Sequence, residues 1–196
     1  MKSPPARRAE LDEVIVNIEL TLASIVQGLA LSFLAERANA VLSGGPATAW
    51  PYVGVAFLTI LLFWSRALIH TLTLIRWPLE FVHNFFYFLC ALVEVLAFQH
   101  LSDPFMWFVL NAVFAAIVWA LFVHDLRIIR LRAEDSTGPS SSRLYRIVLA
   151  DQWLNIRFIM PALFVFTAGS AWAIKAAPDF FLTRHGHLLL VGIQGV

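Results

Sequence analysis

The stretch Phe105–His124, FMWFVLNAVFAAIVWALFVH, decides the fold class of this chain. It contains no Asp, Glu, Lys or Arg. An α-helix rises 1.5 Å per residue, so about 20 mostly apolar residues cross the roughly 30 Å hydrocarbon core of a bilayer. The stretch has this length and therefore predicts a transmembrane helix. Pro104 directly precedes it, at a position where proline commonly opens a helix.

The composition of the whole chain agrees with a membrane protein. Of its 196 residues 60% are hydrophobic and 14% charged, and the mean hydropathy is +0.76. Soluble domains have about 45–50% apolar and about 25% charged residues. The net charge of +1 creates no field that would attract nucleic acid, so no nucleic-acid partner is predicted. The single cysteine, Cys90, excludes an intrachain disulfide and a cysteine-based metal cluster, and no metal or cofactor is predicted.

Four further stretches have the length and composition of transmembrane helices. They are Val14–Ala35, Tyr52–Ile75, Leu79–Phe98 and Ile147–Ala173. Pro161 inside the last stretch predicts a kink. The apolar run His187–Val196 is too short to cross a bilayer as a helix, so we expect a re-entrant or interfacial segment, with the start of a sixth span as the alternative. The predicted fold is an all-α polytopic transmembrane helical bundle, with residues 1–196 forming one domain of five full spans.

The positions of Lys and Arg predict the orientation of the bundle. Basic residues are concentrated before the first span, beside the second connection and after the fourth span, whereas the first connection has only Arg37 and the third has none. The positive-inside rule therefore places the N-terminus in the cytoplasm of a multi-pass protein in the cell or inner membrane. Arg127, Arg130 and Arg132 predict contact with anionic lipids at this face. The Ser-, Gly- and Pro-rich residues 132–143 predict a flexible cytoplasmic linker.

A signal peptide is the alternative reading of the first span, because Ala38-Asn39-Ala40 matches a small-residue cleavage pattern. The acidic residues Glu10, Asp12, Glu13 and Glu19 precede that pattern. Signal peptides have a basic start and an uninterrupted apolar core, so we favour a retained transmembrane helix.

Ionisable residues inside the predicted spans are the candidate functional residues, because they are costly in hydrocarbon. Glu19, His70, His83 and Asp151 are expected roughly 6–8 Å from the cytoplasmic ends of their helices, at 1.5 Å per residue. Glu80, His124 and Asp125 are expected at the cytoplasmic edge, where exposure to headgroups is the simpler interpretation. Arg66 and Arg157 are expected roughly 14–15 Å deep, as charge partners of the carboxylates or as side chains that extend to the headgroups.

A second polar layer is predicted toward the outer side of the membrane. Glu94, Gln27 and Asn111 come from three helices at roughly 20–23 Å, and Glu94 is the one formal charge among them. Glu80, His83, Tyr87 and Glu94 follow the i, i+3, i+7, i+14 spacing of one helix face, so Tyr87 could connect the two layers by hydrogen bonding. Glu94 is the strongest candidate, because a short carboxylate at this depth cannot reach the cytoplasmic headgroups.

These layers favour a small proton or cation transport or channel subunit, because histidine and carboxylate groups exchange protons and bind cations. Five helices are too few to enclose a wide pore, so we expect a homo-oligomer or a membrane protein partner. The alternative is a non-catalytic interaction or assembly subunit, favoured by short loops and the absence of catalytic motifs. A membrane-embedded enzyme using His83 and Glu80 is the third possibility.

The helix layout, with its N-terminus inside, resembles that of bacterial potassium channels built from six-helix repeats. That family is marked by a Phe-Ser-Asp signature in its first helix. The signature does not occur between Val14 and Ala35, so the resemblance implies no role for any residue here.

Overall fold

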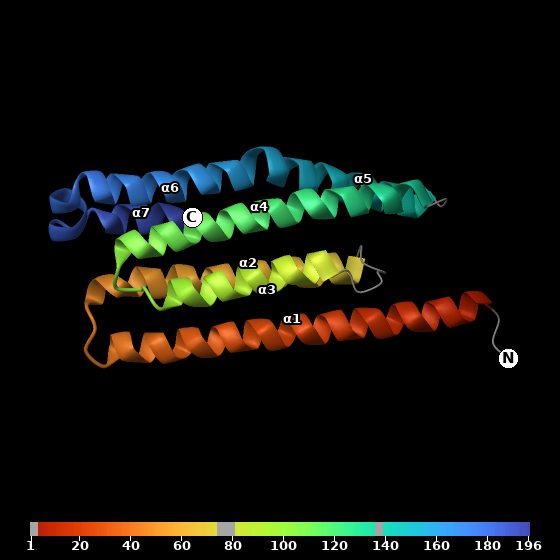
Figure 1. Ribbon diagram of the computed structural model, residues 1–196, viewed down its shortest axis with the longest axis horizontal. Helices are drawn as coiled ribbons and strands as arrows, with labels where there is room; N and C mark the ends of the chain where they lie inside the picture. Colours follow the sequence, from red (N-terminus) through yellow and green to blue (C-terminus); the bar gives the residue numbers. More distant parts are fainter. Residues whose placement is uncertain (1–3, 74–80, 136–138) are drawn as a thin grey trace.

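The computed structural model describes residues 4–73, 81–135 and 139–196, and all regular structure within these ranges is helical (Figure 1). The longer helices are α1 (Pro4–Leu42), α2 (Trp50–Thr73), α3 (Phe81–Phe98), α4 (Pro104–Asp135), α5 (Pro139–Leu154), α6 (Met160–Ala176) and α7 (His187–Gln194). Three short helical turns accompany them: η1 (Ala47–Ala49), η2 (Asn155–Ile159) and η3 (Asp179–Thr183). The predicted all-α bundle is confirmed.

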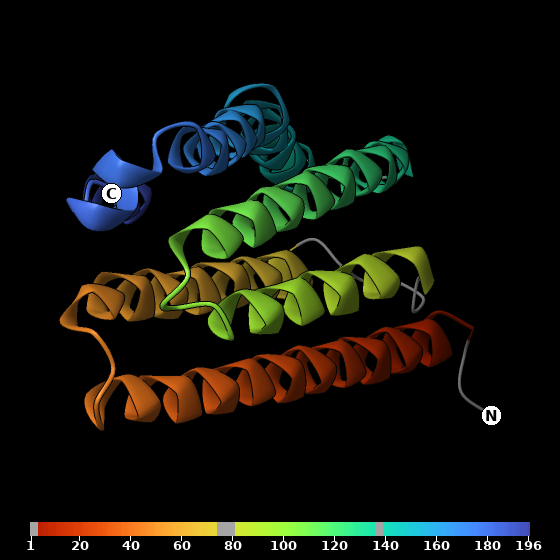
Figure 2. The same ribbon diagram turned by 60° about the vertical axis from the view of Figure 1, so that its left-hand side comes forward.

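The helices form a stack in chain order. α1 packs on α2 and α3, α3 packs on α4, and α4 packs on α5 and α6 (Figures 1 and 2). The connections 43–49, 99–103 and 177–186 lie together at one end, which we call the distal end. The N-terminus lies at the opposite, proximal end, where α2 and α4 end and α3 and α5 begin (Figure 1). α1 and α3 therefore run in the same direction, from proximal to distal.

Four helical segments are long and apolar enough to cross a membrane. They are Val16–Val41, Ala47–Leu68, Pro104–Arg130 and Arg146–Ala176. The apolar segment of α3 is shorter, Val82–Phe98, and its predicted start at Leu79 lies outside the described residues. The prediction of five full spans is therefore not confirmed, although the membrane class is supported. Large apolar side chains on the outside of the bundle, such as Leu62, Val165 and Trp172, agree with a lipid environment.

The helices extend into both ends of the predicted linker 132–143. α4 continues to Asp135 and α5 begins at Pro139, so only residues 136–138 lie between them, outside the described residues. Ser, Gly and Pro predict a loop, but proline is also favoured in the first turn of a helix. Backbone N–H groups in that turn have no acceptor within the helix, so the absence of one in proline costs no hydrogen bond. Pro139 occupies this first position in α5.

A π-helical turn joins α5 to α6 and marks the distortion predicted at Pro161. The turn η2 covers Asn155–Ile159 and ends two residues before the proline (Figure 1). Proline lacks the N–H that would bond four residues back, and its ring collides with that carbonyl group. A wider π-helical turn removes the conflict, and such turns are often found at functional sites.

The C-terminal segment turns back into the bundle. α7 starts at the distal end (Figure 1), packs on α2 and buries Val191 fully. The turn before it requires a positive φ of 57° at His185, an uncommon conformation for a residue other than glycine. The segment therefore folds back along the bundle as a short helix.

Two apolar clusters form the core. The distal cluster joins all the layers and includes Leu34, Ala56, Phe98, Phe108, Ile174 and Val191. The smaller cluster lies nearer the middle of the bundle and contains Cys90, Val118, Phe122 and Met160. Cys90 is a buried packing group, as its apolar surroundings in the sequence predict.

Candidate functional site

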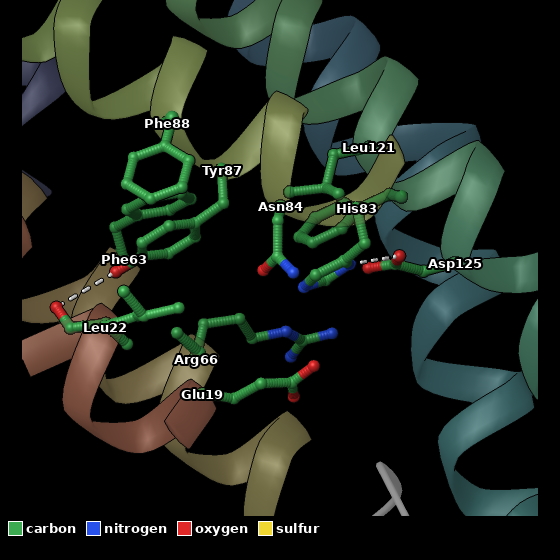
Figure 3. Close-up of a pocket in the computed structure, with 13 residues that line it drawn as sticks. Glu19, Leu22, Phe63, Arg66, His83, Asn84, Tyr87, Phe88, Leu121 and Asp125 are labelled. Atoms are coloured by element: carbon green, nitrogen blue, oxygen red, sulfur yellow. Dashed lines mark hydrogen bonds and ion pairs between the residues drawn. The ribbon is translucent and has the colours of Figure 1, made fainter. Parts of the chain in front are cut away.

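An imidazole–carboxylate pair connects α3 and α4 in the proximal half of the bundle. Nδ1 of His83 lies 2.8 Å from Oδ1 of Asp125, and Asp125 is only 3% exposed (Figure 3). The sequence placed Asp125 at the membrane edge, where exposure would cost little. The expected exposure is wrong, because α4 continues for nearly three more turns, to Asp135, and Asp125 faces α3.

Glu19 of α1 extends the pair into a three-helix cluster. Its carboxyl group is buried and close enough to interact electrostatically with both His83 and Asp125. Together with the neighbouring helices these residues enclose a cavity of about 50 Å³, which is room for a few water molecules. Figure 3 shows the lining residues Asn84, Tyr87, Phe63 and Leu121 around the charged groups. A buried base and two carboxyl groups beside such a space are suited to the exchange of protons.

Arg66 enters the same cavity from α2. Figure 3 shows its guanidinium group extending toward the space between Glu19 and His83. It forms an ion pair with Asp151 of α5 and lies over the ring of Phe122, 5.4 Å from the ring centroid. Its Nε is buried without a hydrogen-bond partner. The structure thus pairs Arg66 with the carboxylate of Asp151.

Tyr87 lies one helical turn further along α3 than His83. Its hydroxyl donates a weak hydrogen bond of 3.4 Å to the carbonyl oxygen of Ala23 in α1 (Figure 3). Its ring stacks on Phe63 of α2 with a centroid distance of 5.1 Å. These contacts hold the hydroxyl between α1 and α3, on the path from the three-helix cluster to the second polar layer.

Glu94 and Gln27 form the second polar layer between α3 and α1. The two residues are only 2% and 3% exposed, and the Gln27 amide lies close to both the Glu94 carboxyl group and the Tyr87 hydroxyl. Both side-chain oxygens of Glu94 and both polar atoms of Gln27 lack a hydrogen bond of acceptable geometry. Unsatisfied buried polar groups are rare and costly. The packing of the neighbouring side chains, rather than hydrogen bonds, therefore keeps Glu94 and Gln27 in place.

We call the residues Glu19, His83, Tyr87, Gln27 and Glu94 the α1–α3 seam. On α1, the buried residues Glu19, Ala23 and Gln27 recur every fourth position, which places them on one helix face. On α3, His83, Tyr87 and Glu94 follow the predicted face. Beyond Glu94, toward the distal end, Ala30, Leu34, Phe98 and Leu101 close the space with apolar side chains. The polar groups of the seam therefore extend from the proximal cluster as far as Glu94, and apolar side chains fill the space between Glu94 and the distal end.

Of the other predicted site residues, Arg66 and Asp151 pair beside the seam, and Arg157 lies apart from it. Arg157 is exposed and lies over the ring of Trp153 at 4.8 Å, and Arg130 lies over the same ring at 5.1 Å. Arg157 is therefore a surface cation on an aromatic ring rather than a partner of the buried carboxylates. Glu80 and the side chain of His70 lie outside the described residues.

The structure also contains polar contacts that the sequence did not reveal, at the distal end. The Tyr52 hydroxyl lies 2.8 Å from Nδ1 of His187. Nε1 of Trp107 donates to Oε1 of Gln194, whose Nε2 donates to Oδ1 of Asn111, both at 2.9 Å. These bonds fasten α7 to α2 and α4. Burial, and then the proximity of His185, lowers the pKa of His187 below its usual 6.5.

Gln152 is a further buried polar residue that the sequence did not single out. It is fully buried in α5 and donates a hydrogen bond of 2.8 Å to the carbonyl oxygen of Phe122. The signal for it would have been the polar series Asp151, Gln152 and Asn155 inside an otherwise apolar segment. Within the described ranges, no three His, Cys, Asp or Glu side chains gather closely enough to hold a metal ion.

The sequence matches no protein-family model, and comparisons with curated proteins and with solved structures find no significant match.

Proposed function

We propose that this chain is a small membrane protein that transfers protons along the α1–α3 seam between the proximal end and Glu94. The observation that carries the proposal is the state of Glu94, a carboxyl group that is 2% exposed and has no hydrogen-bond partner for either oxygen. Burying an ionised carboxylate at this position costs much free energy, whereas burying the neutral carboxylic acid costs much less. Gain and loss of a proton at Glu94 therefore changes the energy of the bundle substantially.

A proton is better suited to this seam than a metal cation. Calcium takes six to eight oxygen ligands and magnesium requires an octahedral set. Around Glu94 the described polar neighbours are Gln27 and Tyr87, which supply too few oxygens. The cavity at the proximal cluster, about 50 Å³, admits water molecules but leaves little space for a cation with its hydration shell.

Each group of the seam has a separate part in the proposed transfer. Glu19 and the His83–Asp125 pair exchange protons with water in the proximal cavity. Tyr87, whose hydroxyl both donates and accepts, connects this cavity with Gln27 and Glu94. The apolar side chains beyond Glu94 block direct passage to the distal end, so release on that side requires the helices to rearrange. A binding site that opens to one side at a time is the property required of a transporter.

The proposed membrane arrangement follows from the distribution of charge. The proximal end faces the cytoplasm, because Arg127, Arg130 and Arg146 surround it and are exposed. In this arrangement α3 is the fifth span, with the start that the sequence predicts at Leu79 and with Glu80 at its cytoplasmic edge. Anionic lipids bind the same arginines. The seam lies between helices of a single chain, so an oligomer is not needed to form it, although a partner subunit remains part of the proposal.

Infrared difference spectroscopy tests the central step. Purified protein is titrated through the neutral and acidic range, and the carbonyl stretch of protonated carboxyl groups is recorded in H₂O and D₂O. We expect a band that responds to bulk pH, shifts in D₂O and is absent from the Glu94→Gln variant. The Asp179→Asn variant, which changes an exposed carboxyl group at the distal end, is the control and should retain the band. A spectrum that Glu94→Gln leaves unchanged would refute proton exchange at Glu94.

A further inference from the structure

A second and larger cavity lies on the other side of Arg66. Its volume is about 440 Å³, within the roughly 300–1,000 Å³ of small-molecule pockets. α2 and α4 supply one part of the wall, and the π-helical turn η2 with the start of α6 supplies another. The end of α7 lines it as well, through Gln194. This cavity is separate from the seam, which lies between α1 and α3.

The cavity is apolar along its length and borders the lipid-facing surface. Leu62, Leu58 and Ile159 line it and are also 71%, 43% and 45% exposed, so they form a rim on the outside of the bundle. The main packing partners of α2 are α1 and α7, and those of α6 are α4 and the helical turns beside it. α2 and α6 are therefore not main packing partners of each other, and a molecule dissolved in the bilayer could enter between them.

The polar groups of the cavity differ at its two ends. At the distal end, Asn111 and Gln194 bond to each other and to Trp107, so their hydrogen bonds are largely satisfied. At the proximal end, Arg66 has a buried Nε without a partner. Among the described residues that line the cavity, Arg66 is the one charged side chain. The cavity thus offers a long apolar wall and one cationic hydrogen-bond donor.

We infer that this cavity binds a single-chain anionic amphiphile, a long-chain carboxylate, with its head at Arg66 and its chain directed toward Asn111. The guanidinium group carries five N–H donors in a planar fork that matches a carboxylate. Asp151 uses one of its terminal nitrogens, which leaves the Nε edge for a second carboxylate.

The size of the cavity favours one hydrocarbon chain over a two-chain phospholipid. Its volume lies in the lower half of the small-molecule range, and Asn111 and Gln194 close its distal end. The Arg66–Asp151 pair is partly exposed, with side-chain exposures of 29% and 43%, so the carboxylate of a ligand can reach the guanidinium group beside Asp151 without opening the core. This inference is independent of proton transfer along the seam.

Equilibrium binding to the full-length protein in phosphatidylcholine nanodiscs tests the inference. Radiolabelled palmitate is the probe, and hexadecanol, with the same chain and no charge, is the competitor. We expect saturable binding of palmitate that Arg66→Gln weakens by at least about tenfold, the loss of one charged hydrogen-bonded contact. Thr59→Trp, which fills the cavity away from Arg66, should abolish binding. Hexadecanol should compete weakly with the unaltered protein.

Arg157→Gln is the matched control, because it removes an exposed arginine that does not line the cavity. It should leave palmitate binding within about twofold, as expected for the loss of a screened surface charge. Equal weakening by Arg66→Gln and Arg157→Gln would indicate general attraction to positive charge and would overturn the inference. So would saturable binding that survives Thr59→Trp, or a retained two-chain phospholipid that palmitate cannot displace. Gel filtration and thermal unfolding of each variant establish that it is folded.

Discussion

Nδ1 of His83 lies 2.8 Å from Oδ1 of Asp125, and this contact joins α3 to α4 beside the carboxyl group of Glu19. The contact is buried on the Asp125 side and borders a small cavity. Carboxylate partners of histidine fix the orientation of the ring and the nitrogen that carries the proton. The pair therefore links two helices and, in the proposed transfer, exchanges protons with water in the cavity.

Asp125→Asn should destabilise the protein. The substitution keeps the shape of the side chain but removes the charge that His83 contacts, at an expected cost of about 1–3 kcal/mol in the free energy of unfolding. Thermal unfolding in detergent measures this. Asp179→Asn, at an exposed position, should change stability by less than about 0.5 kcal/mol. Equal effects of the two variants would contradict the importance of the His83–Asp125 contact.

Glu94→Leu should have the opposite effect on stability. Leucine has a similar volume and removes two buried oxygens without hydrogen bonds, so we expect a gain of about 1–3 kcal/mol in the free energy of unfolding. The same variant should lose proton exchange at this site. A gain in stability together with a loss of function is characteristic of a residue kept for its chemistry. A clear loss of stability would instead identify Glu94 as a structural residue.

The fold class and the faces of the helices could be predicted from the sequence, because both depend on local periodicity and on the length of apolar runs. The face of α3 that carries His83, Tyr87 and Glu94 was predicted from spacing alone, and the structure places these residues toward α1 or α4. The partners could not be predicted. Which residues of α4 and α5 reach His83 and Arg66 depends on how the helices pack, and spacing within one helix carries no information on this.

Two side chains lie in surroundings other than those expected from the sequence, for physical reasons. Asp125 was expected at an exposed edge because a bilayer-length estimate ended the helix near His124, whereas α4 continues beyond the apolar segment. Of the two alternatives for Arg157, pairing with a buried carboxylate is not seen, because the π-helical turn that contains it leaves it exposed on Trp153. The contacts that fasten α7 join residues far apart in the sequence, so no local sequence pattern predicts them.

Acid should loosen the attachment of α7. The pKa of His187 is lowered, first by burial and then by His185, so the unfolded chain binds more protons once the pH falls below 6.5. The contribution of His187 to stability is therefore present above that pH and lost as the pH falls toward its folded pKa. Melting temperatures at about pH 7.5 and about pH 5.5 should differ less in His187→Gln than in the unaltered protein. An unchanged difference would contradict the assignment.

Tyr52→Phe tests the same attachment without a titrating group. The substitution removes the hydroxyl that contacts Nδ1 of His187 and keeps the ring against Trp107. We expect a loss of about 0.5–1.5 kcal/mol, the net value of one hydrogen bond. Hydrogen exchange followed by mass spectrometry should show faster exchange in α7 while exchange in α4 is unchanged. Equal acceleration in both helices would show that the whole bundle, rather than the attachment, is weakened.

The proposed orientation can be tested by cysteine labelling in intact cells. The chain has one cysteine, Cys90, which is fully buried, so an introduced cysteine provides the signal. A membrane-impermeant maleimide should label Ser102→Cys, exposed at the distal end, from outside. Ser141→Cys, in the predicted cytoplasmic segment, should react only after the cells are opened. The reverse pattern would invert the topology and move the proximal cavity to the outer side of the membrane.

Proton flux into liposomes tests the proposed function most directly. The purified protein is reconstituted with a pH-sensitive dye inside the vesicles, and a pH gradient is applied together with a potassium gradient and valinomycin to balance charge. We predict protein-dependent acidification that falls at least about tenfold in Glu94→Gln, because the change removes the one titratable group at the end of the seam. Arg157→Gln should transport normally. Flux that Glu94→Gln leaves unchanged, or no flux from a correctly folded protein, would contradict proton transfer along the α1–α3 seam.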